Sequence, residues 1–374
     1  MLLEPSAAAQ DVATTRGIFP DSIIFGQSAA LSGPAGDLGR SMHLGVLAAF
    51  EEANRGRGVN GRLLKLRVAD DGYEPERAIT NTAALLEEGV FALIGAVGTP
   101  TSNAAEPMAS AAETPYIGPF TGAEFLRQAR PWVVNVRASY YQETEEMVAR
   151  LTDDLGVRRI AVLYQDDSYG NAGLQGVRSA MTSRSMQLVS EGTYVRNTSA
   201  VRRALLEIDE SDPEAVIVIG AYRPVADFIR WARKVGLDAM FVNISFVGSN
   251  ALLQELGREG EGIVVTQVVP YPWDTSIPVV ARYHEALAAV DPDANPGFVS
   301  LEGYLAGLLT VENLRRSGLD PTREDFVEAL RTASPIDLGG FEVRYGPQDN
   351  QGSDRVFLTE IRGGRFVPLS RLRR

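Results

Sequence analysis

The chain of 374 residues contains no cysteine, two histidines (His43 and His284) and two lysines (Lys65 and Lys234). The lack of cysteine excludes disulfide bonds, thiolate nucleophiles and cysteine-ligated zinc. The two histidines lie far apart and lack the HExxH spacing of a zinc protease. Neither lysine follows a glycine-rich phosphate loop, which excludes a P-loop nucleotide site.

Other enzyme signatures are missing too. The sequence has no GxSxG elbow and no SxxK pattern, and the region from Gly95 to Gly98 lacks the GxGxxG spacing of a dinucleotide site. Pairs of aspartates occur at 70–71, 153–154 and 166–167, but adjacent residues in an extended segment point in opposite directions. We therefore expect turn or cap roles for these pairs. An enzyme using such a pair for acid–base chemistry is the weakest hypothesis, and we predict a binding protein without cofactor or metal.

No apolar run reaches the 18 or more residues of a membrane-spanning helix. The formal net charge of -12 argues against nucleic acid or an anionic membrane surface as partner. Residues 1–20 lack the charged start and apolar stretch of a signal peptide, although Ser6–Gln10 resembles the small-residue stretch around a cleavage site. We predict a disordered tail over 1–20, with a signal-peptide remnant as the alternative.

Strand and helix patterns alternate along the chain, which favours an α/β fold with parallel sheets. Apolar strands are predicted near 23–27, 63–68, 91–97 and 116–120, each followed by a helical pattern. A second series starts at 159–164, so the length and the repetition predict two similar lobes. After residue 272 two helical patterns follow without an intervening strand, and we expect this part to pack back on the first lobe.

Two strand ends carry the clearest functional signal. The stretches 94–102 and 115–122 each pass from an apolar strand to small and hydroxyl residues, among them Thr99, Thr121 and Gly122. Free backbone N–H groups, a hydroxyl and helix N-termini then point at one spot, which suits a small carboxylate. Aromatic residues also follow predicted strands, where ligands bind doubly wound sheets. They are Tyr140, Tyr141, Tyr169, Tyr222, Phe246 and Tyr271.

Several segments, in order, resemble the leucine/isoleucine/valine-binding-protein-like solute receptors, a family of type I periplasmic binding proteins. They are Gly26–Pro34, Asp70–Pro75, Tyr164–Gly170 and Gly220–Tyr222. The resemblance covers about Ile18 to Pro368. It implies two Rossmann-like lobes joined by a three-segment hinge that close over a ligand, a class of motion well known for periplasmic binding proteins. The expected lobes are 21–140 plus 270–345 and 141–269 plus 346–374.

The resemblance also assigns roles to individual residues. Thr99 matches the hydroxyl that binds the ligand carboxylate, within a site that includes Thr121. Phe120 and Gly122 match positions whose backbone groups bind the head of an amino acid. The remaining matches are second-lobe tyrosines that close over the ligand, Tyr169 and Tyr222, and a pocket-wall position, Leu38. Phe246 joins the expected site as one of the aromatic residues at strand ends.

Two positions depart from the family pattern. Ser245 stands where branched-chain amino acid receptors place an acid for the ligand ammonium, and Tyr140 stands where others carry an aspartate. An ammonium group buried without a counter-charge is costly. Either another acid reaches the pocket, or the ligand lacks an ammonium group.

The resemblance thus implies a monomeric periplasmic solute-binding protein that delivers a small carboxylate to an ABC permease in the inner membrane. The ligand is an amino acid by family default, or an aromatic or aliphatic carboxylate without the amino group. The alternative function is a ligand-sensing domain of a regulator or receptor, similar to the amide sensors.

Overall fold

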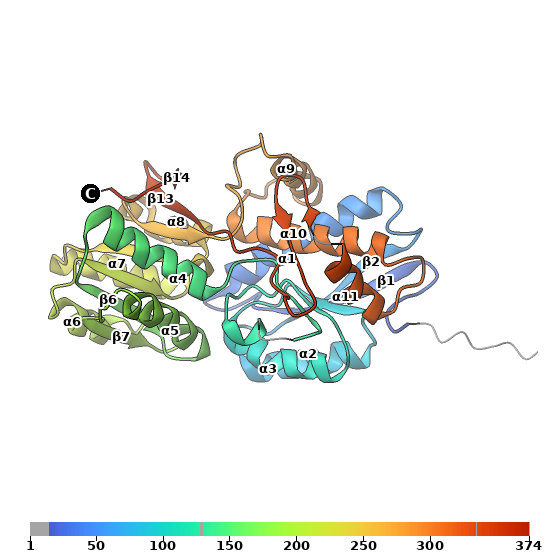
Figure 1. Ribbon diagram of the computed structural model, residues 1–374, viewed down its shortest axis with the longest axis horizontal. Coiled ribbons are helices and arrows are strands. Elements are labelled where there is room, and N and C mark those ends of the chain that lie inside the picture. Colours follow the sequence, from blue (N-terminus) through green and yellow to red (C-terminus); the bar gives the residue numbers. More distant parts are fainter. Residues whose placement is uncertain (1–14, 128–129, 334, 374) are drawn as a thin grey trace, which may run out of the picture.

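The computed structural model describes residues 15–127, 130–333 and 335–373. The described residues form two α/β lobes, which lie side by side in Figure 1 with the first on the right and the second on the left. This architecture confirms the predicted fold class.

The first lobe is built on a parallel sheet in the order β2-β1-β3-β4-β5. Its strands are β1 (Ser22–Ala29), β2 (Leu63–Asp70), β3 (Ala92–Ile94), β4 (Tyr116–Ile117) and β5 (Val133–Val134). Its helices are α1 (Gly36–Arg55), α2 (Pro75–Glu87), α3 (Thr99–Ala111), α9 (Pro278–Val290), α10 (Phe298–Arg316) and α11 (Arg323–Thr332). Helices α9 and α10 pack against α1, as expected for the part after residue 272. A small two-stranded sheet follows, β11 (Ile336–Asp337) with β12 (Glu342–Val343).

The second lobe is built on a sheet in the order β14-β13-β10-β9-β8-β6-β7. Its strands are β6 (Ile160–Gln165), β7 (Ser190–Tyr194), β8 (Ala215–Ile219), β9 (Met240–Asn243), β10 (Val264–Gln267), β13 (Phe357–Arg362) and β14 (Arg365–Leu369). Its helices are α4 (Tyr140–Ala149), α5 (Ser168–Thr182), α6 (Arg202–Asp209), α7 (Tyr222–Val235) and α8 (Ser249–Leu256). Strands β13 and β14 add to the sheet in antiparallel fashion.

Local sequence explains why the central elements form where they do. Every residue of β8 is buried, as its run of Ala, Val and Ile requires for a parallel strand covered on both faces. Helix α4 begins with a capping box in which Ser139 and Gln142 satisfy each other's backbone N–H groups. Helix α5 begins at the Asp167 side chain, which accepts from two backbone N–H groups. These caps fix the helix starts that face the first lobe.

The chain passes between the lobes three times. It crosses after β5, returns after β10 and crosses again before β13. The last crossing lies later than the expected boundary at residue 345. The Asn135 backbone donates to Asn350 O at 2.9 Å and accepts from Gly352 N at 2.8 Å, so this segment extends along the first sheet. The passage to the second sheet therefore comes after Gly352.

The segment before β1 is held against the first lobe. Ile18 forms a bridge with Ile23, and Ile24 N donates to Gly17 O at 2.8 Å. Ile18 is buried in the core. The disordered tail expected over 1–20 can therefore apply only to residues 1–14, which lie outside the described residues.

Candidate ligand-binding site between the two lobes

The first lobe presents the end of β3 and the start of α3 toward the second lobe. Gly98 has φ 102°, and a Cβ there would lie 2.1 Å from the Tyr73 ring, so only glycine fits this turn. Thr99 opens α3 directly after it and is fully buried. The positive end of the helix dipole thus lies at a buried hydroxyl, as the pattern at 94–102 predicted. The stretch 115–122 is instead followed by the short 3-10 helix Glu124–Leu126, which does not supply the second helix N-terminus that was expected.

The hydroxyl groups of Thr99 and Thr121 form a pair, with 2.7 Å between their oxygens. Thr121 Oγ1 also accepts from Ala123 N at 3.2 Å. The pair carries two hydroxyl protons, and the bond within it uses one. Among residues 15–127, 130–333 and 335–373, the second proton finds no acceptor with hydrogen-bond geometry. One donor is therefore left for a ligand.

Tyr140 adds a second hydroxyl beside this pair. Its backbone N donates to Gly122 O at 2.7 Å, and a Cβ on Gly122 would lie 2.4 Å from the Tyr140 ring. The Tyr140 hydroxyl is buried and has no hydrogen-bond partner in the described part of the chain. Burial raises its pKa, while Arg137 and the Thr121 hydroxyl lower it, although Thr121 falls short of hydrogen-bond geometry. Tyr140 is thus a neutral, buried donor.

Rings from both lobes meet beside these hydroxyls. The Phe246 ring of the second lobe stacks on Phe120 of the first, with 5.1 Å between centroids and 27° between planes. Its centroid lies 4.5 Å from that of Tyr169 and 6.0 Å from that of Tyr73. Tyr140 and Tyr169 are 5.6 Å apart. We call these five buried residues the aromatic cluster, and its ring contacts cross from lobe to lobe.

Two further predicted residues form a separate contact between the lobes. The Tyr222 hydroxyl on α7 accepts from Asp37 N at the start of α1, at 3.4 Å. Leu38, one position later, packs against Gly248 before α8. Both side chains are buried. The structure thus places the ten predicted residues at the junction of the lobes in three groups: seven at the threonine pair and the aromatic cluster, Tyr222 and Leu38 in this second contact, and Ser245 among buried charges.

Ser245 belongs to a buried group of charges beneath the aromatic cluster. Glu143 Oε1 accepts from Arg137 Nη2 at 2.6 Å and from Ser245 Oγ at 2.9 Å. Glu143 Oε2 accepts from Ser245 N at 2.9 Å and Thr266 Oγ1 at 2.6 Å. These four bonds saturate the carboxylate. We call Arg137, Glu143, Ser245, Thr266 and Glu302 the buried ion network.

Glu302 on α10 completes the buried ion network from the first lobe. Its Oε1 lies 3.6 Å from Arg137 Nη1, an ion contact beyond hydrogen-bond distance. Burial raises the pKa of Glu302 to about 7, because Arg137 lowers it only in part and Glu143 raises it further. The pKa of Arg137 is raised, because the attraction of Glu302 and Glu143 outweighs the cost of burial. Its guanidinium also lies 5.4 Å from the Phe120 ring centre and 5.6 Å from that of Tyr140.

Sequence reasoning missed the buried ion network except for Ser245, and it missed the role of Tyr73. A signal existed for Glu302, which is the one charged residue in the run 298–311. Arg137 likewise lies between apolar residues before a predicted helix. Tyr73 lies within Asp70–Pro75, one of the segments that resemble the family. Its φ of 66° forms a left-handed turn that directs its side chain to the second lobe.

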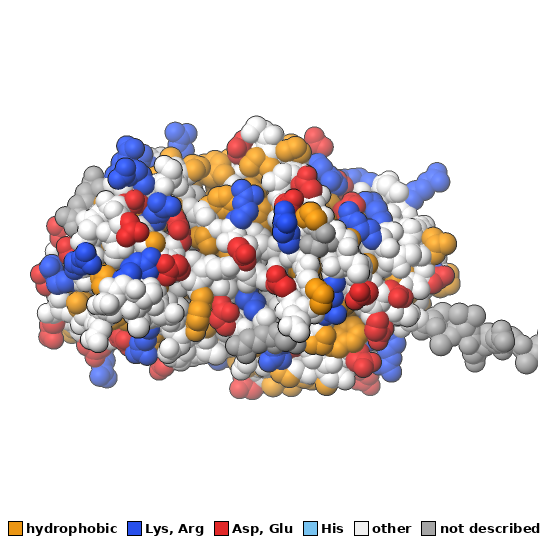
Figure 2. Space-filling view, viewed as in Figure 1, with side chains coloured by type: hydrophobic (Ala, Val, Ile, Leu, Met, Phe, Trp, Pro, Cys, Tyr) orange, Lys and Arg blue, Asp and Glu red, His pale blue; other side chains and the backbone are white. Residues whose placement is uncertain are grey.

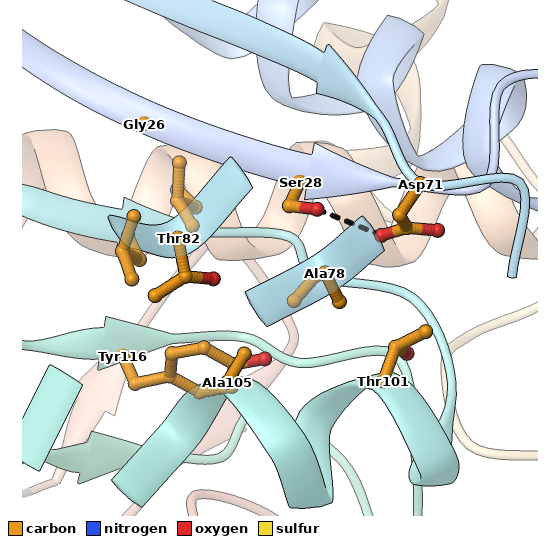
Figure 3. Close-up of a pocket in the computed structure, with 11 residues that line it drawn as sticks. Gly26, Ser28, Asp71, Ala78, Thr82, Thr101, Ala105 and Tyr116 are labelled. Carbon is orange, nitrogen blue, oxygen red and sulfur yellow. Dashed lines mark hydrogen bonds between the residues drawn. The ribbon is translucent and has the colours of Figure 1, made fainter. Parts of the chain in front are cut away.

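The aspartates at 70–71 and Asp167 have the turn and cap roles expected of them, whereas Asp153 and Asp154 lie within the helical segment Arg150–Asp154. Asp70 accepts from the backbone N of Leu31 and Gly72 at 2.9 Å each. Asp71 accepts from Tyr73 N at 2.9 Å and from Ser28 Oγ at 2.8 Å, beside a cavity of about 10 Å³ between β1, α2 and α3 (Figure 3). Burial raises the pKa of Asp71 to about 6. Their bonds support the loop that carries Tyr73.

The described residues include no group of three or more His, Cys, Asp or Glu placed to hold a metal ion. None of their helices is both long and apolar enough to cross a membrane. Figure 2 shows basic and acidic side chains interspersed over one face of both lobes. Charges of both signs thus alternate on this face, as is usual for a solvated surface.

Two lobes, three crossings and hydroxyls at the junction are the features of a hinged receptor. A family model described as a periplasmic binding protein matches residues 22–365. The chain belongs to this family. Its members are binding proteins, and this chain is similar to proteins named for amino acids.

Three similar proteins illustrate the range of ligands for which members of this fold are named. The leucine-, isoleucine-, valine-, threonine- and alanine-binding protein of Pseudomonas aeruginosa is 24% identical over 316 residues, 83% of this chain and 82% of that protein. The crystal structure of a possible leucine/isoleucine/valine-binding protein from Rhodopirellula baltica superposes with TM-score 0.90 at 38% identity, covering 96% of this chain and 98% of that one. A fatty acid ABC transporter substrate-binding protein from Thermomonospora curvata shares the fold, with TM-score 0.87 at 19% identity over 95% and 93% of the chains.

Proposed function

We propose that this protein is the periplasmic, monomeric binding component of an ABC importer and carries a small carboxylate to a permease in the inner membrane. The ligand sits at the junction of the lobes, beside Thr99 and Thr121. Relatives named for amino acids support this general class. The local chemistry favours a carboxylate without an amino group.

One observation carries the proposal: two buried hydroxyl donors lie side by side without acceptors. The Thr99–Thr121 pair has one free proton, and the Tyr140 hydroxyl is unpartnered among the described residues. Two converging donors suit the two oxygens of a carboxylate. The nearby acid Glu143 is saturated by its four hydrogen bonds, so it is not free to receive an ammonium group.

Binding then proceeds without a bond-making step. The first lobe takes the carboxylate through the Thr99–Thr121 pair, and the Tyr140 hydroxyl supplies the second donor. The hinge closes, and Tyr169, Tyr222 and Phe246 arrive from the second lobe. A ligand beside the threonine pair replaces part of the ring contacts that the lobes otherwise make with each other. Water is excluded, which strengthens the hydrogen bonds to the carboxylate.

The test is a thermal-shift screen with matched pairs, each an amino acid beside the acid of the same side chain without its amino group. A ligand at about 100 times its dissociation constant adds roughly 2.7 kcal/mol to stability. We expect the deaminated acids, aromatic ones included, to raise the melting temperature more than their amino acid partners. Stabilisation by amino acids alone would contradict the inference that no acid in the site is free to pair with a ligand ammonium group. Stabilisation by neither class would contradict the carboxylate site.

A further inference from the structure

A second set of contacts joins the lobes at the exposed edge of the aromatic cluster, beginning at the residue after Tyr73. Glu74 lies in the first lobe, directly before α2, and Arg196 and Asn197 lie in the second lobe, after β7. Arg196 Nη2 contacts Glu74 Oε2 at 2.8 Å, and Asn197 Nδ2 donates to Glu74 Oε1 at 2.7 Å. Asn197 Nδ2 also lies 3.2 Å from Gly72 O. Both oxygens of Glu74 are thus held by the opposite lobe.

Each partner is also anchored within its own lobe, Arg196 through its side chain and the other two through the backbone. Arg196 Nη1 lies 3.3 Å from Asp167, the residue that caps α5. Asn197 has φ 58°, a left-handed turn that aims its amide across the junction. On the other side, Glu74 N donates to Asp71 O at 3.0 Å. Arg196, held by Asp167, therefore loses less side-chain freedom when the lobes close than an unanchored arginine would.

The contact lies at the rim of the junction. The Glu74 side chain is 39% exposed and that of Arg196 is 23% exposed, whereas the aromatic cluster is buried. Burial raises the pKa of Glu74, but hydrogen bonds from Arg196 and Asn197 outweigh it and hold the pKa below its usual value. Glu74 is therefore charged at neutral pH. The Glu74–Arg196–Asn197 group makes no contact with Thr99, Thr121 or Tyr140 among the bonds of the described residues.

We propose that Glu74, Arg196 and Asn197 form a latch that stabilises the closed form without touching the ligand. They are positioning residues: they act by setting how much of the protein is closed. A latch of this kind multiplies the affinity for every ligand by the same factor, because each ligand gains the same closing free energy. Residues of the pocket, in contrast, change the ratio of affinities between ligands. The inference rests on the proposed function for its affinity test and on geometry alone for its distance test.

The variants are Glu74→Gln, which keeps size and removes charge, and Glu74→Ala. The matched control is Glu191→Gln, because Glu191 pairs with Arg178 at 2.7 Å within the second lobe. We expect both Glu74 variants to weaken binding of two or more ligands from the screen by one common factor, about three- to tenfold for alanine. Glu191→Gln should leave affinities unchanged. Unequal factors, or unchanged affinity in Glu74→Ala, would overturn the latch.

A distance measurement tests the latch independently of any ligand. The chain has no cysteine, so Ala83→Cys on α2 and Leu206→Cys on α6 accept two spin labels cleanly. Pulsed electron resonance then gives the fraction of short interlobe distances. We expect this fraction to fall in Glu74→Ala, with or without ligand, and to stay constant in Glu191→Gln. An unchanged fraction would overturn the latch. If no carboxylate binds, the proposed function fails while this measurement still decides on the latch.

Discussion

The two lobes contribute different chemistry to their junction. The first lobe offers short side chains and backbone at strand ends, with Thr99 and Thr121 as the main members, and adds the rings of Tyr73 and Phe120. The second lobe offers large side chains, among them Tyr169, Tyr222 and Phe246, all buried. This difference supports the proposed division of work: the threonine pair of the first lobe holds the polar end of the ligand with help from the Tyr140 hydroxyl, and the other rings of the second lobe cover its apolar part and exclude water.

Between them lies the buried ion network, which belongs to both lobes. Arg137 stands in the first crossing, Glu302 in a first-lobe helix, and Glu143, Ser245 and Thr266 in the second lobe. A buried pair of this kind fixes geometry more than it adds stability, because desolvation offsets much of the attraction. The buried ion network thus fixes the local geometry beneath the surfaces that the two lobes present at their junction.

Arg137→Met should have the largest effect, because it leaves Glu143 and Glu302 buried without their cation. We expect a loss of about 3–5 kcal/mol in the free energy of unfolding. Urea denaturation measures it. The control is Arg178→Met, which breaks an ion pair whose side chains are 47% and 29% exposed and should cost less than about 1 kcal/mol. Equal losses in the two variants would contradict the role of the buried ion network.

A comparison of Phe246→Ala with Phe228→Ala distinguishes packing at the junction from packing in the core of one lobe. Phe228 is equally buried but packs within the second lobe, against Phe241. We expect Phe228→Ala to cost about 3–5 kcal/mol, and Phe246→Ala to cost about 2 kcal/mol less, since part of its contacts exist only in the closed form. Urea denaturation without ligand compares the two. A larger loss for Phe246→Ala would mean that the cluster is a permanent core.

Glu302→Gln should change how stability depends on pH. Glu302 loses its proton near pH 4.5 when unfolded and near pH 7 in the folded protein. Between these values the folded protein binds the extra proton, so the free energy of unfolding falls as pH rises through this window. Relative to wild type, Glu302→Gln should gain about 1–3 kcal/mol from pH 5 to pH 8. Urea titrations across this range check it, and parallel curves would place the Glu302 pKa elsewhere. Asp71 contributes equally in both proteins.

The sequence predicted the polar half of the site better than the charged half. Thr99, Thr121 and Gly122 follow apolar strands, and the carboxyl ends of neighbouring parallel strands must meet at one edge of a sheet. Their proximity therefore follows from local pattern and topology. Tyr140, Tyr169 and Phe246 were predicted for the same reason, whereas Tyr73 and the direct ring contacts across the junction were not.

The buried ion network could not be predicted in this way. Arg137, Glu143 and Glu302 come from a crossing segment and two helices of different lobes, so only the hinge brings them together. Glu143 lies in the acidic run 143–146, which looks like a solvated helix face. The last crossing was predicted too early for a related reason. The pairing of Asn350 and Gly352 with Asn135 joins residues distant in sequence and leaves no local pattern.

The most direct test titrates one ligand from the screen and its primary amide, by calorimetry, into the wild-type protein and into Thr99→Val. If the first lobe holds the carboxylate through Thr99, the wild-type protein should bind the acid about 10- to 100-fold more tightly than the amide. Thr99→Val should lose most of that preference, because the lost hydrogen bond matters most to the charged oxygen. An unchanged preference in Thr99→Val would show that the carboxylate binds elsewhere.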